Sequence, residues 1–440
     1  MKDFDKNQIH YQATRLLERS MIECSPDKLI QKSLSFSEGK ILINNTVINL
    51  IGDIYVIGFG KASLSMYEGL INSISNHRIK GALIVTHIQD HKTQYNNTKV
   101  IKSTHPYISD KSINAGKEIL KFVSKLNKND LLISLVSGGG SAMIAAPIDN
   151  ITINEKVECI SNILTAGIPE REANEIKKAL SKIKGGGLAA ASGSERIVNL
   201  ILSDERNHKI DAIASGPTVE PEKNEALEII EKYAISHIIP DKILDSILAR
   251  DNQAQNNSPK KIENILAGSR EDLIENMRNN ASHFEFDSVH ILDNLSEITS
   301  ESAVDLLLAK YHEIYKRSKS GNHLVISTGE VQVPIEKINA AKGGRNQHLC
   351  ALMMNKAEFD FKFSFIAYAT DGVDFLEGCA GAFFTNNHLA KIKEIKEDMM
   401  QYIKNKKTYD LHKRLNTLIS SNITGHNVSD FYLFSFNKER

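Results

Sequence analysis

The segment from Leu131 to Pro147, which reads LLISLVSGGGSAMIAAP, constrains the fold more than any other stretch of the chain. Five of its first six residues are apolar, and such a short run is typical of a buried strand in a parallel sheet. Three glycines follow between Ser137 and Ser141, and a small apolar helix start comes next. Glycine takes positive φ angles and lets the backbone approach a ligand closely. The segment therefore predicts a strand, a tight loop and a helix at the carboxyl edge of a parallel sheet.

The loop in this segment is a candidate phosphate site. Backbone N–H groups ahead of a helix start attract anions, and the two serine hydroxyls add further donors. A flexible connection that binds nothing explains the glycines equally well. The loop is not a P-loop, because no Gly-Lys-Ser/Thr sequence closes it. The loop residues that we assign to cofactor binding are Ser137, Gly138, Gly139, Gly140 and Ser141.

A similar strand, glycine turn and helix lie upstream. An apolar strand over Asp53 to Ile57 runs into GFGK and then into a helix that begins at Ala62. This order is the opening of a doubly wound α/β unit. Lys61 stands at the helix start, where the helix dipole disfavours a cation, so its placement makes sense if an anion binds there too. A solvated surface lysine is the alternative.

Several further apolar strands end in residues suited to binding or catalysis. These ends are Ser203-Asp204, Thr328-Gly329-Glu330 and the stretch that contains Asp371 and Asp374, and a glycine-rich loop places Arg345 at a further helix start. Ligand sites in open sheets lie outside the carboxyl ends of strands. Together these groups predict a polyphosphate site with a divalent cation, because phosphoryl transfer needs cations, N–H donors and carboxylates for Mg²⁺ or the attacking hydroxyl. For any single acid, capping a helix or pairing with a lysine is the simpler explanation.

Length and charge narrow the class of protein. A chain of 440 residues suggests two or three domains. Lys plus Arg and Asp plus Glu each total 54, which argues against nucleic acid as the main partner. The four cysteines form no CxxC pair, and no apolar run is long enough to span a bilayer, so we expect a cytoplasmic protein with no membrane partner. The polar stretch from Asp251 to Lys261 is linker-like and separates residues 1–250 from residues 262–440.

The motifs, taken in order, resemble those of the glycerate 2-kinase family, whose C-terminal part is the MOFRL-type domain. The resemblance extends along nearly the whole chain. Its motifs are GFGKAS (58–63), HPYISDKS (105–112), SGGGSAM (137–143), LSKIKGGGLA (180–189), IASGPTV (213–219), GGRNQ (343–347) and ATDG (369–372). Each motif alone is modest evidence, but their ordered recurrence is specific.

The resemblance implies ATP-dependent phosphorylation of D-glycerate to 2-phospho-D-glycerate, with Mg²⁺ present. It also implies an α/β fold of two domains with the active site in the cleft between them. Residues 1–250 would form a larger, doubly wound, Rossmann-like domain, and residues 262–440 a smaller MOFRL-type α/β domain. Lys61 and Arg345 would hold the phosphoryl group and substrate, and Asp204 would activate the hydroxyl or hold the metal. The partner is then a small molecule, and we allow for a homodimer.

The chain departs from the family pattern at several positions. Asn207, His208 and Lys209 stand where the family usually carries Gly-Asp-Asp, so two carboxylates are replaced. Gly187 stands where an arginine commonly follows KGG. Two other functions therefore stay open. The first is an NAD(P)-dependent hydroxypyruvate reductase, because GFGKAS is a weak match to a dinucleotide turn. The second is a relative that binds a ligand without turning it over.

Overall fold

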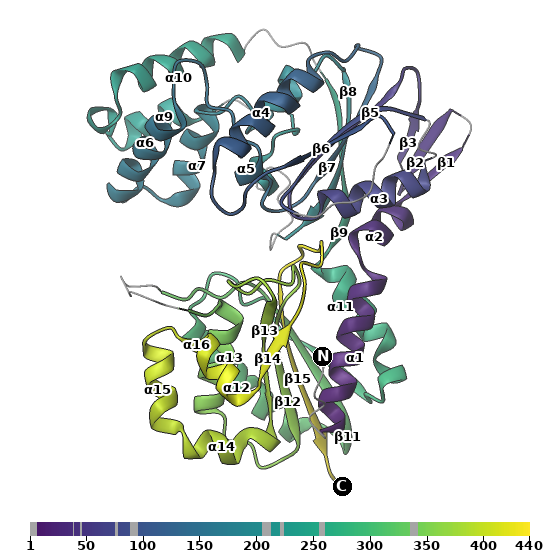
Figure 1. The fold of residues 1–440 in the computed structure, drawn as a ribbon, viewed down its shortest axis with the longest axis vertical. Coiled ribbons are helices and arrows are strands. Elements are labelled where there is room, and N and C mark those ends of the chain that lie inside the picture. Colours follow the sequence, from purple (N-terminus) through teal and green to yellow (C-terminus); the bar gives the residue numbers. More distant parts are fainter. Residues whose placement is uncertain are drawn as a thin grey trace. The chain divides into compact units, whose positions relative to one another are not determined.

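The computed structural model describes residues 7–37, 39–44, 46–74, 78–88, 96–204, 213–220, 224–254, 260–334 and 342–440. Contacts along the chain divide it into two compact units, both drawn in Figure 1. The central unit comprises Pro26–Gly268, and the terminal unit comprises Met1–Ser25 together with Ser269–Arg440. The chain therefore leaves the terminal unit once and returns to it once.

This division differs from the sequence-based one, which places residues 1–250 in a single domain. The first helix, α1 (Gln8–Glu23), belongs to the terminal unit, where it contacts the strands β12 (Phe363–Ala369) and β15 (Asp430–Lys438). The two divisions differ because an amphipathic pattern specifies only part of how a helix packs. It shows that one face of a helix needs an apolar partner, but it does not show which sheet supplies that partner.

Six strands form the main sheet of the central unit, in the order β6-β5-β4-β7-β8-β9. Their bounds are β4 (Ile54–Phe59), β5 (Ile79–Thr86), β6 (Thr98–Lys102), β7 (Leu131–Val136), β8 (Arg196–Ser203) and β9 (Lys261–Ser269). The pairs β4–β5, β5–β6, β4–β7 and β7–β8 are parallel. The strand order reverses at β4, and in such sheets ligands bind beyond the carboxyl ends at the reversal. The prediction of a doubly wound parallel sheet is confirmed.

Helices cover both faces of this sheet. On one face, α3 (Ser63–Ser73) contacts β4 and β5. On the other face, α4 (Asp110–Val123), α5 (Gly140–Met143) and α8 (Gly187–Ala191) bury apolar side chains against β4, β5, β7 and β8. The two-sided covering explains why β7 is buried at every position, as its continuous apolar sequence predicts.

Two smaller groups of elements complete the central unit. One is an isoleucine-rich helical cluster, visible at the upper left of Figure 1, that consists of α6 (Ile153–Thr165), α7 (Glu170–Ala179), α9 (Ala226–Lys232) and α10 (Asp241–Ala254). The other is α2 (Pro26–Ser33) with an antiparallel sheet of β1 (Leu34–Ser37), β2 (Lys40–Ile43) and β3 (Thr46–Asn49). Residues in β2 alternate between exposed and buried, as expected for a sheet with one solvated face.

The terminal unit contains a second six-stranded sheet, in the order β10-β11-β15-β12-β13-β14. Its remaining strands are β10 (Ser288–Ile291), β11 (Gly321–Thr328), β13 (Cys379–Thr385) and β14 (Leu418–Ser420). The β10–β11 pair is parallel, and the other four pairs are antiparallel. The prediction of an α/β unit is confirmed. The carboxyl ends of its strands, however, do not all lie at one edge of the sheet, because β15 is antiparallel to its neighbours β11 and β12.

Helices also cover both faces of the terminal sheet. On one side lie α1 and α11 (Arg270–Asn280), which contact each other. On the other side lie α12 (Ser300–Arg317), α13 (Arg345–Lys356), α14 (Leu389–Glu394), α15 (Lys396–Lys404) and α16 (Thr408–Leu415). The helix α13 packs directly on β12 and β13 and is buried over most of its length. Within the described ranges, no helix combines the length and apolar character needed to cross a membrane.

Candidate functional site

The glycine-rich loop after β7 is shaped by backbone conformations that favour glycine. Gly139 has a φ angle of 80°, and a Cβ atom placed there would lie 3.0 Å from Nε2 of His105 and 3.3 Å from Cγ of Lys61. Gly60, in the upstream glycine turn, has a φ angle of 115°, and a Cβ there would collide with the carbonyl and the hydroxyl of Ser137. Side chains are therefore excluded from the contact between the two loops.

Hydrogen bonds join the two loops into one cluster, which we call the glycine-loop cluster (58–63 and 137–141). The N–H of Lys61 donates to the carbonyl of Gly138 at 3.0 Å, and the N–H of Ser137 donates to the carbonyl of Phe59 at 3.3 Å. The N–H of Ala62 donates to Oγ of Ser137 at 3.0 Å. The structure thus brings together Lys61 and the SGGGS loop, which lie far apart in the sequence. Ser137 is buried, and its hydroxyl accepts the bond that links the loops.

The loop also presents donors without acceptors. The N–H groups of residues 138–141 form no hydrogen bond within the described part of the chain. They stand at the start of α5, whose carbonyl groups point the other way. With the half-buried Lys61 beside them, these donors provide positive potential at the carboxyl edge of the sheet. The arrangement can hold an anionic group against the backbone.

Asp204 reaches the same edge of the sheet from β8. Phe59 in β4 pairs with Val136 in β7, and Val136 pairs with Ile201 in β8. Because the three strands are parallel, the residues that follow them emerge at one edge. Asp204 directly follows β8 and is half-buried. The positions His208 and Lys209, where two family carboxylates are replaced, lie outside the described residues.

Lys184 is a basic residue of this region to which the sequence analysis assigns no role. The N–H groups of Gly185 and Gly186 donate to the carbonyls of Ser215 and Gly216, at 2.9 and 2.7 Å. That turn touches the glycine-loop cluster, since a Cβ on Gly140 would lie 2.9 Å from Cβ of Ala214. Lys184 is half-buried with no acidic partner among the described residues.

The environment of Lys184 is unfavourable for its charge. Burial lowers the pKa of its ammonium group to about 8, and the positive charge of Lys177 lowers it further. Lysines whose pKa is lowered in this way cluster at functional sites. The signal in the sequence is a lysine placed directly before three glycines, in the motif LSKIKGGG. A periodicity argument does not detect it, because the segment is neither helix nor strand.

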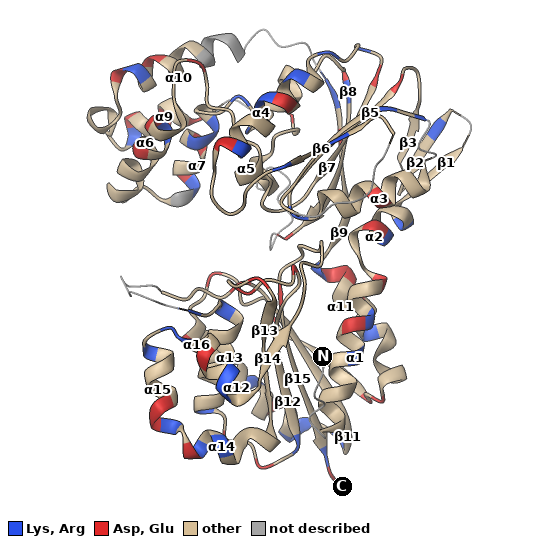
Figure 2. Cartoon of the chain, in the orientation of Figure 1, with Lys and Arg blue, Asp and Glu red and all other residues tan. Residues whose placement is uncertain are grey.

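The terminal unit holds Arg345 in a cluster of acids, which we call the Arg345 cluster (Arg345, Glu330, Asp371, Asp374 and Asp430). Arg345 begins α13, and its Nε lies 2.5 Å from Oδ2 of Asp430 while its Nη2 lies 3.3 Å from Oδ1. The same Nη2 lies 2.7 Å from Oε1 of Glu330. Figure 2 shows acidic segments gathered in the loops at this end of the terminal sheet.

Asp430 was not singled out from the sequence, and strand direction explains why. It is the first residue of β15, and it pairs with Ala369 at the carboxyl end of β12. On the other side of β15, Phe431 pairs with Thr328 at the carboxyl end of β11. Because β15 is antiparallel to both neighbours, its amino end lies between their carboxyl ends. A rule that looks only at carboxyl ends misses this residue.

Asp374 has a structural task in the described cluster. Its two carboxylate oxygens accept the N–H groups of Asn346 and Gln347, at 3.1 and 2.8 Å, in the first turn of α13. A Cβ on Gly344 would collide with this carboxylate. Burial raises the pKa of Asp374 to about 6, and the nearby charge of Asp430 adds to the shift. Asp374 therefore caps and orients the helix that carries Arg345.

The remaining acids are more open. Asp371 is half-buried, and its Oδ1 accepts the N–H of Val373 at 3.0 Å. Burial raises the pKa of Asp430 to about 6, the positive charge of Arg345 opposes that shift, and the charge of Glu330 reinforces it. Among the residues that the structure describes, no three His, Cys, Asp or Glu side chains are grouped as a metal cage would require. A cation here would have to take ligands from a bound phosphate or from water as well.

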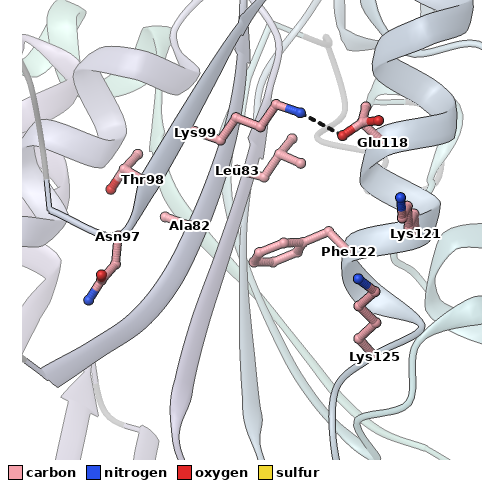
Figure 3. A pocket seen from close by; sticks show the side chains of 9 residues that line it. All are labelled: Ala82, Leu83, Asn97, Thr98, Lys99, Glu118, Lys121, Phe122 and Lys125. Atoms are coloured by element: carbon pink, nitrogen blue, oxygen red, sulfur yellow. Dashed lines mark hydrogen bonds and ion pairs between the residues drawn. The ribbon is translucent and has the colours of Figure 1, made fainter.

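A hollow of about 560 Å³ lies elsewhere in the central unit, between α4 and the strands β5 and β6 (Figure 3). Phe122 points from α4 toward Leu83, and Lys99 bonds Glu118 at 2.6 Å. The lining residues belong to the middle of β5, the start of β6 and the last turns of α4, so the hollow is away from the carboxyl edge. Lys121 and Lys125 suit the negative end of a helix dipole without any ligand.

Comparison with known proteins identifies the class. A parallel sheet with donor-rich glycine loops at its switch point is suited to holding phosphate groups, and this protein is a kinase. The chain belongs to the family described as "Domain of unknown function (DUF4147)", whose model matches residues 12–248, and the MOFRL family model matches residues 323–430. The resemblance to the glycerate 2-kinase family is thereby confirmed.

Named relatives support this assignment. The chain is 29% identical to a glycerate 2-kinase of Picrophilus torridus, over 86% of this chain and 87% of that protein. It is 27% identical to a glycerate 2-kinase of Pyrococcus horikoshii, over 95% of each. The crystal structure of the PH0495 protein from Pyrococcus horikoshii matches with a TM-score of 0.79 at 26% identity and covers 100% of both chains.

One curated relative carries a different name. A putative hydroxypyruvate reductase of Agrobacterium vitis is 27% identical over 86% of this chain and 98% of that protein. That name describes the relative, and it matches the first of the two other functions that the sequence leaves open.

Proposed function

We propose that this kinase transfers the γ-phosphoryl group of ATP to the 2-hydroxyl of D-glycerate, giving 2-phospho-D-glycerate and ADP in the cytoplasm. The observation that carries the proposal is the glycine-loop cluster, in which Lys61 lies at the switch point of a parallel sheet beside four backbone N–H groups that have no acceptor among the described residues. A phosphate chain supplies the acceptors that these donors lack.

Each proposed residue has a chemical task. The 2-hydroxyl oxygen forms a bond to the γ-phosphorus while the bond from that phosphorus to the β,γ-bridging oxygen breaks, and ADP leaves with the electron pair. Asp204 accepts the hydroxyl proton. Lys61 and Arg345 neutralise the oxygens of the moving phosphoryl group. That residues of both units serve one reaction follows from the family resemblance.

The described donors fit a nucleotide with its magnesium ion. Asp204 and Asp371 offer the hard carboxylate oxygens that Mg²⁺ prefers, and the described acids form no complete cage. Such a set suits an ion that arrives on the phosphates, where it offsets their negative charge. We assign Asp371 to the cofactor side of the site, whereas Glu330 is paired with Arg345 and the carboxylate of Asp374 already accepts two N–H groups of α13.

The test is an assay of ADP release with purified protein, Mg²⁺, ATP and D-glycerate. We expect release that depends on glycerate, and a product that enolase consumes, which distinguishes 2-phosphoglycerate from the 3-phosphate. Lys61→Ala is the matched control for contaminating activity. Equal ADP release by the two proteins would overturn the proposal. Oxidation of NADH or NADPH by hydroxypyruvate without ATP would favour the reductase. The name of the Agrobacterium relative and the GFGKAS turn are the two observations that support this alternative.

A second measurement tests whether both units act on the same step. Lys61→Ala and Arg345→Ala are compared singly and together. If both side chains serve one transition state, the loss in kcat/KM of the double variant is smaller than the product of the single losses. If the loss in the double variant equals the product of the single losses, the two residues act independently of each other.

A further inference from the structure

The two acids that contact Arg345 differ in exposure. The Asp430 side chain is 3% exposed, and it lies inside the sheet at the start of the buried strand β15. The Glu330 side chain is 47% exposed and follows β11 in a loop. A buried bidentate pair keeps its geometry, whereas an exposed ion pair contributes about 0–1 kcal/mol and exchanges readily.

The donors of Arg345 are also divided unequally. The carboxylate of Asp430 accepts aligned hydrogen bonds from Nε and Nη2 of Arg345. Glu330 approaches Nη2 as an ion pair only, without an aligned hydrogen bond. Nη1 has no acceptor in the part of the chain that the structure covers, and the Arg345 side chain is 36% exposed. The edge formed by Nη1 and Nη2 is therefore the edge at which an incoming oxyanion can bind with two parallel contacts.

We propose that Glu330 is an exchangeable carboxylate that occupies the ligand edge of Arg345 until an oxyanion of the substrates displaces it, while Asp430 is the positioning residue that holds the guanidinium throughout. The inference rests on the proposed kinase function for the identity of the ligand. The chemistry required is an oxyanion with two oxygens in one plane, which is either the carboxylate of glycerate or a phosphoryl group of the nucleotide.

The backbone around Glu330 supports such a movement. Gly329 is fixed on both sides, since its N–H donates to the carbonyl of Asp430 at 3.1 Å and its carbonyl accepts the hydroxyl of Tyr432 at 2.7 Å. The N–H of Glu330 donates to Oγ of Ser296 at 3.1 Å. The main chain is thus held in place, and only the exposed side chain has to turn for the exchange.

The main test is Glu330→Gln, with Glu313→Gln as the control. Glu313 is an exposed glutamate on α12 that pairs with Lys310 and Arg317, so its substitution makes the same change in net charge in the same unit. Removing the competing charge should lower the KM for one ligand about two- to fivefold. A decrease for D-glycerate identifies the carboxylate, and a decrease for MgATP identifies the phosphoryl group. An unchanged or raised KM for both ligands would overturn the exchange.

The role of Asp430 is tested in the same background. Asp430→Asn should raise the KM for the same ligand about tenfold or more, because the guanidinium loses its charged, two-point hold. In the Asp430→Asn background, Glu330→Gln should give no further gain. A purely structural loss would lower kcat and thermal stability together and would not select one ligand. A full gain from Glu330→Gln in that background would disprove the positioning role.

A binding measurement separates this inference from the proposed function. Calorimetric titration with D-glycerate, and separately with inorganic phosphate, should show tighter binding of one probe to Glu330→Gln than to the wild type. If the wild type releases no ADP but this tightening is seen, the kinase proposal fails and the exchange stands. If the wild type is an active glycerate kinase and neither probe binds more tightly, only the exchange fails.

Discussion

The glycine-loop cluster of the central unit and the Arg345 cluster of the terminal unit present positive charge in opposite ways. The first relies on main-chain N–H groups, with positive φ angles at Gly60 and Gly139 and a lysine added. The second relies on one side chain, whose charge is held by the buried carboxylate of Asp430. A backbone site is already organised when the loop folds, whereas a side-chain site needs partners to hold its rotamer. The two clusters should therefore tolerate different substitutions.

The largest effects are expected when the charges themselves are removed or exchanged. Lys61→Ala and Arg345→Ala should each lower kcat/KM about 10³-fold or more, because each removes a charge from the transferring phosphoryl group. Lys61→Arg should retain more activity than Arg345→Lys, since only Arg345 depends on bidentate pairing. Steady-state kinetics of the four variants gives the comparison. Equal retention by the two charge-conserving variants would contradict it.

A glycine substitution should damage the backbone site almost as severely. Gly139→Ala combines a φ angle of 80° with contacts of about 3 Å to His105, so we expect kcat/KM to fall about 10²-fold. Gly167→Ala is the matched control, because its φ angle is 84° and nothing lies within 4 Å of the added Cβ. It should lose only about 1 kcal/mol of stability and little activity. Similar kinetic losses in both variants would mean that strain alone, and not the site, explains the effect.

Removing the cap of α13 should show how far the Arg345 cluster depends on the buried carboxylate of Asp374. Asp374→Asn keeps the shape but replaces one of the two accepting oxygens by an NH₂ donor, so one N–H group of α13 loses its acceptor, at a cost of about 1–3 kcal/mol. Hydrogen exchange of residues 345–356 should accelerate, while exchange in β7 should not change. Accelerated exchange in β7 to the same extent would show that the effect is not local.

The stability that Asp374 contributes should change with pH in a definite direction. The pKa of Asp374 is about 6 in the folded protein, above its usual 3.8, so the folded state binds the proton more tightly. Its contribution to stability is fully present below pH 4 and is lost as the pH rises through about 6. Chemical denaturation between pH 4 and pH 7 should therefore show a smaller pH dependence in Asp374→Asn than in the wild type. An identical slope would mean that this carboxyl titrates normally.

The smallest effect is expected at Lys184. Lys184→Met removes a half-buried charge without an acidic partner among the described residues, so it should stabilise the protein by up to about 1 kcal/mol at pH 7. The pKa of Lys184 is about 8, below the usual 10.5, so wild-type stability rises as the pH rises from 8 to 10.5 and the advantage of the variant shrinks. Melting temperatures at pH 7 and pH 9.5 check this. Lys182→Met, which removes an exposed pair with Asp149, is the control.

The parallel sheet and its glycine loops follow from the sequence because each depends on local rules. A buried parallel strand is a continuous apolar run, and glycines mark positive φ angles. The partner of Arg345 does not follow in this way. Asp430 precedes an ordinary strand, and its importance comes from an antiparallel pairing between residues far apart in the chain. The membership of α1 in the terminal unit was missed for the same reason, since its partner lies more than 300 residues away.

The position of β15 affects how the molecule is synthesised. This strand, residues 430–438, lies between β11 and β12 in the interior of its sheet. On the ribosome, β11 and β12 have no strand to join them until residue 438 has emerged, and the face of α1 that contacts β15 stays uncovered until then. The central unit, by contrast, is complete once residue 268 has emerged. Nascent chains stalled between these two points should carry one folded unit and one exposed helix that chaperones can bind.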